Sequence, residues 1–242
     1  MTDESWAGWY RDSRGSEAVI LTTDGRQLRI RVRGTDFEGA SFDTLAPVAG
    51  APAEAAAFDL AAGVLGDCVL EWDLPLPVLV AGTARQATLS CLLSLRRADP
   101  DLCLALHLDG AVYESRRAER DFASALSTIR AALPPDIHLQ ICAACALSGY
   151  LPASDRGMSG GLGCFRDTKD AYRDAAEEPG VEGLWDRRAG VVQEIWSCRE
   201  FEPRPSGPEF VPAEQGERPT IPQVPAERTD PGRLGAYPLE HA

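Results

Sequence analysis

The sequence is poor in several features that would quickly assign it to a class. Its 242 residues include a single lysine, three histidines and two methionines, and the formal net charge is −13. No basic stripe interrupts this acidity, so a nucleic acid or an anionic membrane surface would be repelled. We therefore expect neither to bind. The charge favours solubility or a protein partner with a basic face.

Long apolar runs are also missing. No stretch approaches the roughly 18 uncharged apolar residues of a membrane-spanning helix. The first residues, Met1 to Trp6, are acidic and lack the apolar segment of a secretory signal. We therefore expect a cytoplasmic protein. Thiols stay reduced in that compartment, and clustered cysteines there are more often metal ligands or redox centres than disulfides.

Residues 1–110 are predicted to be mostly β-structure. Residues 18–22 and 27–33 alternate between apolar and polar around Thr23-Asp24-Gly25, which favours a hairpin with a type I′ turn. Further alternating runs predict strands at 68–72, 89–95 and 102–108.

The period changes after residue 110. Apolar residues recur at helical spacing within residues 115–133, until Pro134-Pro135 ends the helix. A strand over 137–141, a helix from Asp167 to about residue 178 and a strand over 191–197 are predicted next. The expected fold class is α+β: an antiparallel β-sheet, as a sandwich or half-barrel, packed with one main helix.

The chain is expected to form a single α+β domain over residues 1–202, within which residues 137–202 form a zinc-binding module. Beyond it the composition shifts, because nine of the 18 prolines fall within residues 203–242 and aliphatic residues are few. Such a segment cannot bury enough apolar surface to fold. We expect residues 203–242 to be a disordered, proline-rich tail.

Four of the seven cysteines lie in the second half of the chain. Cys142 and Cys145 form a CxxC pair, which can place two thiolates on one metal ion. Cys164 follows a glycine-rich loop, and Cys198 ends a strand-like run. Four thiolates would form a closed tetrahedral site, so the sequence predicts a structural Zn²⁺ held by Cys142, Cys145, Cys164 and Cys198.

Four thiolates around Zn²⁺ leave a formal charge of −2, which Arg166 and Arg199 could offset because each follows close on a proposed ligand. The alternative for each ligand is a partly buried free cysteine, since cysteine is often buried as a small apolar residue. We adopt that simpler interpretation for Cys68 and Cys91, which share strand faces with leucines.

An enzyme remains the main alternative. A strand followed by CxxC is typical of a thiol oxidoreductase, although Pro152 follows too soon for the long helix that such a site needs. A zinc-dependent hydrolase would need an open coordination position or a histidine in the site. Residues 157–161 match the GxSxG nucleophile elbow, but only His241 follows and the flanks resemble loops. We expect these glycines to let the chain turn around the metal.

The cysteine region resembles an uncharacterised bacterial family, a domain of unknown function. Its motif reads CxxCxxSxYxP, then GCFR, then a final CPEFE. This chain carries the three parts at residues 142–152, 163–166 and 198–202, with Arg199 in place of the expected proline. The resemblance implies a shared four-cysteine site and implies no reaction.

Together these features predict a cytoplasmic, non-catalytic protein-interaction protein with a structural four-cysteine zinc site, of the immunity or accessory type. No residue is assigned a catalytic role. The alternative is an enzyme, either a CxxC thiol oxidoreductase or a zinc-dependent hydrolase.

Overall fold

A computed structural model describes residues 3–48, 57–96, 100–116, 119–150, 158–176 and 181–204. The tail expected over residues 203–242 lies outside these ranges apart from its first two residues. Within the described ranges, no helix is long and apolar enough to cross a membrane.

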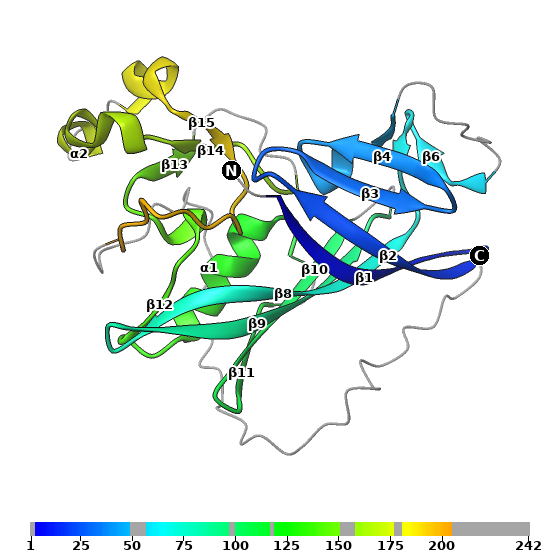
Figure 1. The fold of residues 1–242 in the computed structure, drawn as a ribbon, viewed down its shortest axis with the longest axis horizontal. Helices are drawn as coiled ribbons and strands as arrows, with labels where there is room; N and C mark the ends of the chain where they lie inside the picture. The colour runs from blue at the N-terminus through cyan, green and yellow to red at the C-terminus, as the bar shows by residue number, and fades with distance from the viewer. Residues whose placement is uncertain are drawn as a thin grey trace.

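One long antiparallel sheet dominates the described chain (Figure 1). Its strands follow the order β11-β10-β9-β8-β1-β2-β3-β4-β5, and β12 pairs with a separate part of β8. The strands are β1 (Glu4–Asp12), β2 (Gly15–Thr23), β3 (Leu28–Val32), β4 (Thr35–Gly39), β5 (Ala46–Pro47), β8 (Val69–Val80), β9 (Thr83–Ser94), β10 (Asp101–Leu108), β11 (Ala111–Glu114) and β12 (Ile137–Leu139).

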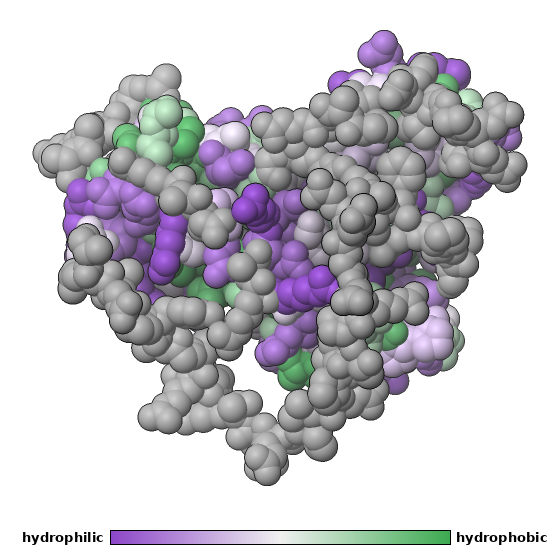
Figure 2. All heavy atoms as spheres, turned by 180° about the vertical axis from the view of Figure 1, so that it is seen from behind, coloured by the Kyte–Doolittle hydropathy of each residue, from purple (hydrophilic) through white to green (hydrophobic). Residues whose placement is uncertain are grey.

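Two-residue alternation explains which face of the sheet is buried. In β3, Leu28, Ile30 and Val32 are buried while the two arginines between them are exposed, because successive strand side chains point to opposite faces. The apolar faces enclose the main core. Seen from behind, the described surface is largely hydrophilic, with apolar side chains in small separate areas (Figure 2). The expected mostly antiparallel sheet with short helices is confirmed.

Four tight hairpins set the register of these strands. Each has a two-residue turn in which both φ angles are positive, as type I′ turns require. The turns are Arg33-Gly34, Ala62-Gly63, Ala81-Gly82 and Asp109-Gly110. The second of these joins β6 (Leu60–Ala61) to β7 (Val64–Leu65), which form a small sheet of their own.

The hairpin expected around Asp24-Gly25 is present, but the type I′ turn predicted for it is wrong. Gly25 has φ of 87°, whereas Asp24 is not among the residues with positive φ. Instead, the Asp24 carboxylate accepts hydrogen bonds from the backbone N–H groups of Arg26 and Gln27, both at 2.8 Å. The aspartate side chain therefore closes a longer turn.

Helix α1 (Phe122–Ala132) is shorter than the helix expected within residues 115–133. The side chain of Asp121 caps it by accepting a hydrogen bond from the Ser124 amide at 2.7 Å, which stabilises a helix start at this point. The helix packs against β10 and β11. Its Phe122 ring stacks on Phe42 at 5.7 Å, and Phe42 in turn stacks on Trp72 of β8 at 4.8 Å.

The C-terminal elements gather at one end of the long sheet (Figure 1). They are a three-stranded sheet of β13 (Ser148–Tyr150), β14 (Leu162–Cys164) and β15 (Gly190–Val192), and helix α2 (Lys169–Ala176). The strand expected over 191–197 is much shorter. It stops before Gln193 and Glu194, whose side chains are buried and hydrogen-bonded to other segments.

A buried ion pair fastens β1 to the turn after β3. The Arg33 guanidinium donates two hydrogen bonds of 2.7 Å to the carboxylate of Asp12, whose side chain is fully buried. Tyr10 also donates to Asp12, at 3.0 Å. Burial by itself raises the pKa of Asp12, but the bonds from Arg33, the Arg14 amide and Tyr10 outweigh it and lower this pKa to about 2.

We predict that Asp12→Asn lowers the free energy of unfolding by about 2–4 kcal/mol, because it leaves the Arg33 charge unpaired in a largely buried position. The matched control is Asp36→Asn, whose partner Arg31 lies 3.8 Å away on the exposed face and should contribute less than about 1 kcal/mol. Urea denaturation measures both. Equal losses in the two variants would contradict the importance of the buried pair.

Candidate functional site

The four expected zinc ligands lie in one region of the structure, on three segments. Cys142 and Cys145 flank a single 3₁₀ turn, Cys164 ends β14, and Cys198 lies beyond β15. The pKa of Cys142 is raised by its hydrogen bond with Cys198, then by burial, and then by the charges of Cys198, Cys164 and Cys145. All four thiols are therefore close enough to interact.

Backbone hydrogen bonds hold these segments against each other. The Cys142 amide donates to the Trp196 carbonyl at 2.7 Å, and the Ala146 amide donates to the Glu202 carbonyl at 2.7 Å. In addition, Ser148 pairs with Cys164 between β13 and β14. The turn that carries Cys142 and Cys145 is thus fixed to the segments of both distant cysteines.

Two of the sulfurs accept hydrogen bonds from backbone amides. The Leu147 amide donates to Sγ of Cys145 at 3.4 Å, and the Glu200 amide donates to Cys198. The pKa of Cys198 falls to about 6, chiefly because Cys142 donates a hydrogen bond to it; the Glu200 amide and the Arg166 guanidinium lower it further, against the effect of burial. This environment favours the thiolate form of Cys198.

The donor chemistry fits zinc, since four thiolates supported by amide N–H groups are a common zinc ligand set. The arrangement of the side chains, however, is not that of a formed metal site. Throughout the described ranges, no group of three or more histidine, cysteine, aspartate or glutamate side chains is arranged so that it could hold a metal ion. All seven cysteines are free thiols, so no disulfide joins the four in this region.

The remaining sequence-based assignments have clear positions. Cys68 and Cys91 are each 2 % exposed and belong to the main core, as expected. Cys142 begins a three-residue 3₁₀ turn and not an α-helix, and its raised pKa makes it a poor attacking thiol. The CxxC pair therefore lacks the feature that activates the nucleophile of a thiol oxidoreductase.

The segment after Cys198 is attached to α2 by ion pairs. The only lysine of the chain, Lys169, contacts Glu200 at 2.8 Å and Glu202 at 3.2 Å. Arg173 contacts Glu202 at 2.6 Å. Each pair is partly exposed and weak on its own, but as a network they hold this segment beside the cysteines.

A buried carboxylate, Glu194, lies between the cysteine region and the main sheet. It is 2 % exposed and accepts hydrogen bonds from the Tyr150 hydroxyl at 2.8 Å and from the Gly160 amide at 2.6 Å. Burial raises its pKa to about 7, and the charge of Asp121 adds to the rise. Sequence analysis missed this residue; the adjacent polar pair Gln193-Glu194 inside an apolar run was the available signal.

The glycine-rich loop is arranged around this carboxylate. The described part of the loop starts at Met158, whose amide binds Asp43 at 3.2 Å; the Ser159 amide binds the Ser41 hydroxyl at 2.9 Å, and the Gly160 amide binds Glu194. Gly160 and Gly161 have positive φ. The glycines therefore let the loop wrap around side-chain oxygens, while the expectation that they turn around a metal stays a prediction.

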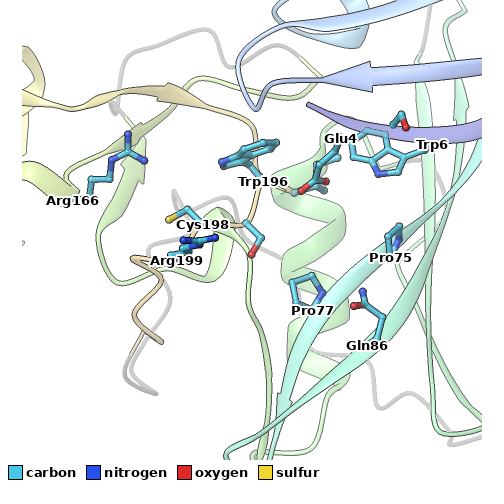
Figure 3. Close-up of a pocket in the computed structure, with 12 residues that line it drawn as sticks. Glu4, Trp6, Pro75, Pro77, Gln86, Arg166, Trp196, Cys198 and Arg199 are labelled. Carbon is cyan, nitrogen blue, oxygen red and sulfur yellow. The ribbon is translucent and has the colours of Figure 1, made fainter. Parts of the chain in front are cut away.

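An open cavity of about 810 Å³ separates the cysteine region from the sheet (Figure 3). It lies where the sheet splits, because β1 pairs with β8 only along Val69–Trp72 and β12 pairs with β8 only along Val78–Val80. Its lining includes Glu4, Trp6, Pro75 and Pro77 from the sheet and Arg166, Trp196, Cys198 and Arg199 from the other side.

A family model described as a family of unknown function, DUF6304, matches residues 4–148. The matched part runs from β1 to the first residue of β13 and includes Cys142 and Cys145, but it ends before Cys164 and Cys198. The expected resemblance to a family of unknown function is therefore confirmed, while the four-cysteine motif extends beyond what the match covers. No curated protein and no solved structure matches the chain.

We predict that Glu194 makes the protein less stable as pH rises. Its folded-state pKa of about 7 exceeds the ordinary value of 4.5, so the folded state binds this proton more tightly, and stability is lost as pH rises from about 4.5 through 7. Glu194→Gln should remove about 3 kcal/mol of that dependence.

Urea unfolding of the wild type and of Glu194→Gln at pH 5 and pH 8 measures the effect as a difference between the two proteins. Glu200→Gln, at an exposed carboxylate, is the control and should follow the wild type. Parallel pH dependence in all three proteins would show that Glu194 is ionised at neutral pH.

Proposed function

The chain belongs to DUF6304, a family of unknown function, and we propose that it is a non-catalytic interaction protein whose cysteine module is fastened by one structural zinc ion. The cysteine module comprises residues 137–204 as far as they are described. Cys142, Cys145, Cys164 and Cys198 would hold the ion.

The observation that carries this proposal is the packing of the three cysteine-bearing segments against one another, held by backbone hydrogen bonds. Cys142 interacts with Cys145 in the same turn and also with Cys164 and Cys198, which come from distant parts of the chain. Clustering four thiols without a bound cation gains little, because each added thiolate raises the pKa of its neighbours. A divalent cation removes that repulsion and converts its binding free energy into folding free energy.

Several features support a structural rather than a catalytic ion. Four thiolates would close the coordination sphere, whereas catalytic zinc sites keep one position open. Arg166, which already lowers the pKa of Cys198, and the amides of Leu147 and Glu200 would offset the remaining negative charge. The ion would join the turn at Cys142, the end of β14 and the segment after β15.

Interaction with another protein is the role that this scaffold favours. The described part of the module consists of short strands and helices, and zinc would give it a rigid surface at the end of the sheet. The net charge of −13 speeds encounter with a partner that has a basic face.

A second candidate function is thiol–disulfide exchange by Cys198 and Cys142, favoured by the hydrogen bond between these two sulfurs. The Cys198 thiolate would attack a substrate disulfide and release one thiolate, which takes up a proton. Cys142 would then displace the second substrate thiol, leaving a Cys142–Cys198 disulfide. An external dithiol must supply two electrons to regenerate the pair.

We predict that purified protein carries about one zinc ion per chain and that Cys164→Ser and Cys198→Ser each abolish it. Elemental analysis measures the metal. Cobalt substitution gives a second readout, since four thiolates produce intense sulfur-to-cobalt charge-transfer bands. The matched control is Cys103→Ser, at a partly exposed cysteine outside the module, which should keep full metal content. Metal-free wild-type protein from reducing expression conditions would refute the zinc site.

The redox candidate predicts that the wild-type protein reduces disulfides, whereas the zinc proposal predicts that it does not. With all four thiolates on zinc, wild-type protein should not reduce a model disulfide when dithiothreitol is the electron donor. Turnover that disappears in Cys198→Ser and in Cys142→Ser, and survives in Cys145→Ser, would replace the structural zinc by the Cys142–Cys198 redox pair. Insulin reduction followed by turbidity is a suitable assay.

A further inference from the structure

The cavity at the split of the sheet is kept open by the sequence of β8. Pro75 and Pro77 lie along the edge of β8 between its pairings with β1 and β12. The Pro77 carbonyl accepts a hydrogen bond from the Gln140 amide at 2.8 Å, so both prolines direct their missing N–H toward this edge. Proline cannot donate to a neighbouring strand. The edge is therefore unsuited to another strand and leaves space for a ligand.

Aromatic and apolar side chains give the cavity firm walls. Trp6 is 4 % exposed, Ile195 5 % and Trp196 7 %, and all three line the cavity. The Trp196 ring lies directly on Gly25, where an added Cβ would come within 2.5 Å of the indole. Both indoles are thus fixed by packing, and a ligand would meet a surface that is already ordered.

Opposite charges lie on the two sides of these walls. Arg166 and Arg199 lie on the side of Cys198, while Glu4 lies across Trp196 from them (Figure 3). Arg199 is exposed and forms no ion pair with the described residues; Arg166 has only Asp167, its neighbour in sequence, at 3.9 Å. Glu4 forms no ion pair with them either, and burial raises its pKa.

We propose that this cavity binds a ligand with a carboxylate at one end, a cationic amine at the other and an apolar spacer between them. Arg166 and Arg199 bind the carboxylate, for which the guanidinium fork is suited. Glu4 binds the amine, and the spacer packs against Trp6 and Trp196.

The cavity suits this ligand class in size as well as charge. Small-molecule sites typically enclose about 300–1,000 Å³, with mostly apolar walls and few polar groups, and this cavity of about 810 Å³ lies in that range. Two sources carry the same chemistry. One is a free ω-amino carboxylate. The other is the C-terminus of a polypeptide with a basic side chain near its end, captured through its carboxylate.

NMR titration of the full-length protein with three probes tests the proposal: 6-aminohexanoate, hexanoate and hexylamine. The zwitterion should bind up to about fivefold more tightly than either singly charged probe, since one more exposed ion pair contributes up to about 1 kcal/mol. Equal binding of the three probes, or binding of none, would overturn the proposal. The metal content is measured on the same sample, so that failure of this proposal is distinguished from failure of the zinc site.

Two variants assign the ends of the site. Arg199→Ala should weaken 6-aminohexanoate and hexanoate but leave hexylamine unchanged, whereas Glu4→Gln should weaken 6-aminohexanoate and hexylamine but leave hexanoate unchanged. Arg31→Ala, on the exposed face of β3, is the control and should change none. If either variant weakened binding of all three probes equally, the assigned orientation of the ligand would be refuted.

A peptide ending in Lys-Leu-Leu, and the same peptide with an amidated C-terminus, distinguish the two sources. Tighter binding of the free-acid peptide than of 6-aminohexanoate identifies a polypeptide C-terminus as the ligand. Weaker binding identifies a free small molecule. Equal binding of the acid and amide peptides would contradict the role of the two arginines.

Discussion

The buried polar pair Gln193-Glu194 is the interaction on which the arrangement of this protein depends. The side chain of Gln193 accepts a hydrogen bond from the Thr23 hydroxyl at the end of β2, and the Gln193 backbone N–H donates to the Gly25 carbonyl. Glu194 binds the loop at Gly160 and the hydroxyl of Tyr150. Buried polar groups are costly unless they are paired, so these bonds specify one position of the cysteine module on the sheet.

That position determines the geometry of both candidate sites. The residues after Glu194 lead directly to Trp196 and Cys198, so the same segment forms one wall of the cavity and supplies one of the four thiols. Any change that moves Glu194 would shift the cavity wall and the thiol cluster together. The raised pKa of Glu194 shows that this arrangement is held at some cost in stability near neutral pH.

Local patterns predicted the sheet well and the site only in part. Alternation located β3, β9 and β10 because one face of each strand is buried, but the second half of β8 was missed, since Pro75 and Pro77 interrupt the usual strand composition. The four type I′ turns each consist of a residue followed by glycine, and this pair between two alternating runs was a sufficient signal for them. The sequence prediction assigned the type I′ turn to Asp24-Gly25 instead. Cys142 and Cys145 could be paired from spacing alone. Their association with Cys164 and Cys198 depends on β14 and on the segment after β15, which no spacing rule specifies.

The cavity was beyond sequence reasoning for a related reason. Glu4 and Arg199 are almost a chain length apart in the described sequence, and their opposition arises only because β1 leaves β8 at Trp72. A protein with net charge −13 places two arginines beside this opening, and the one ion pair they form with the described residues is that of Arg166 with the adjacent Asp167. The surrounding acidic field there draws cationic groups rather than anions. In a ligand that carries both charges, the amine is attracted by the negative field of the protein during approach. Its carboxylate then pairs with the arginines after docking. The acidic protein surface and the arginines at the cavity together favour a zwitterion over a simple anion. The same two features explain how a protein that attracts basic partners can have a cavity with a cationic end.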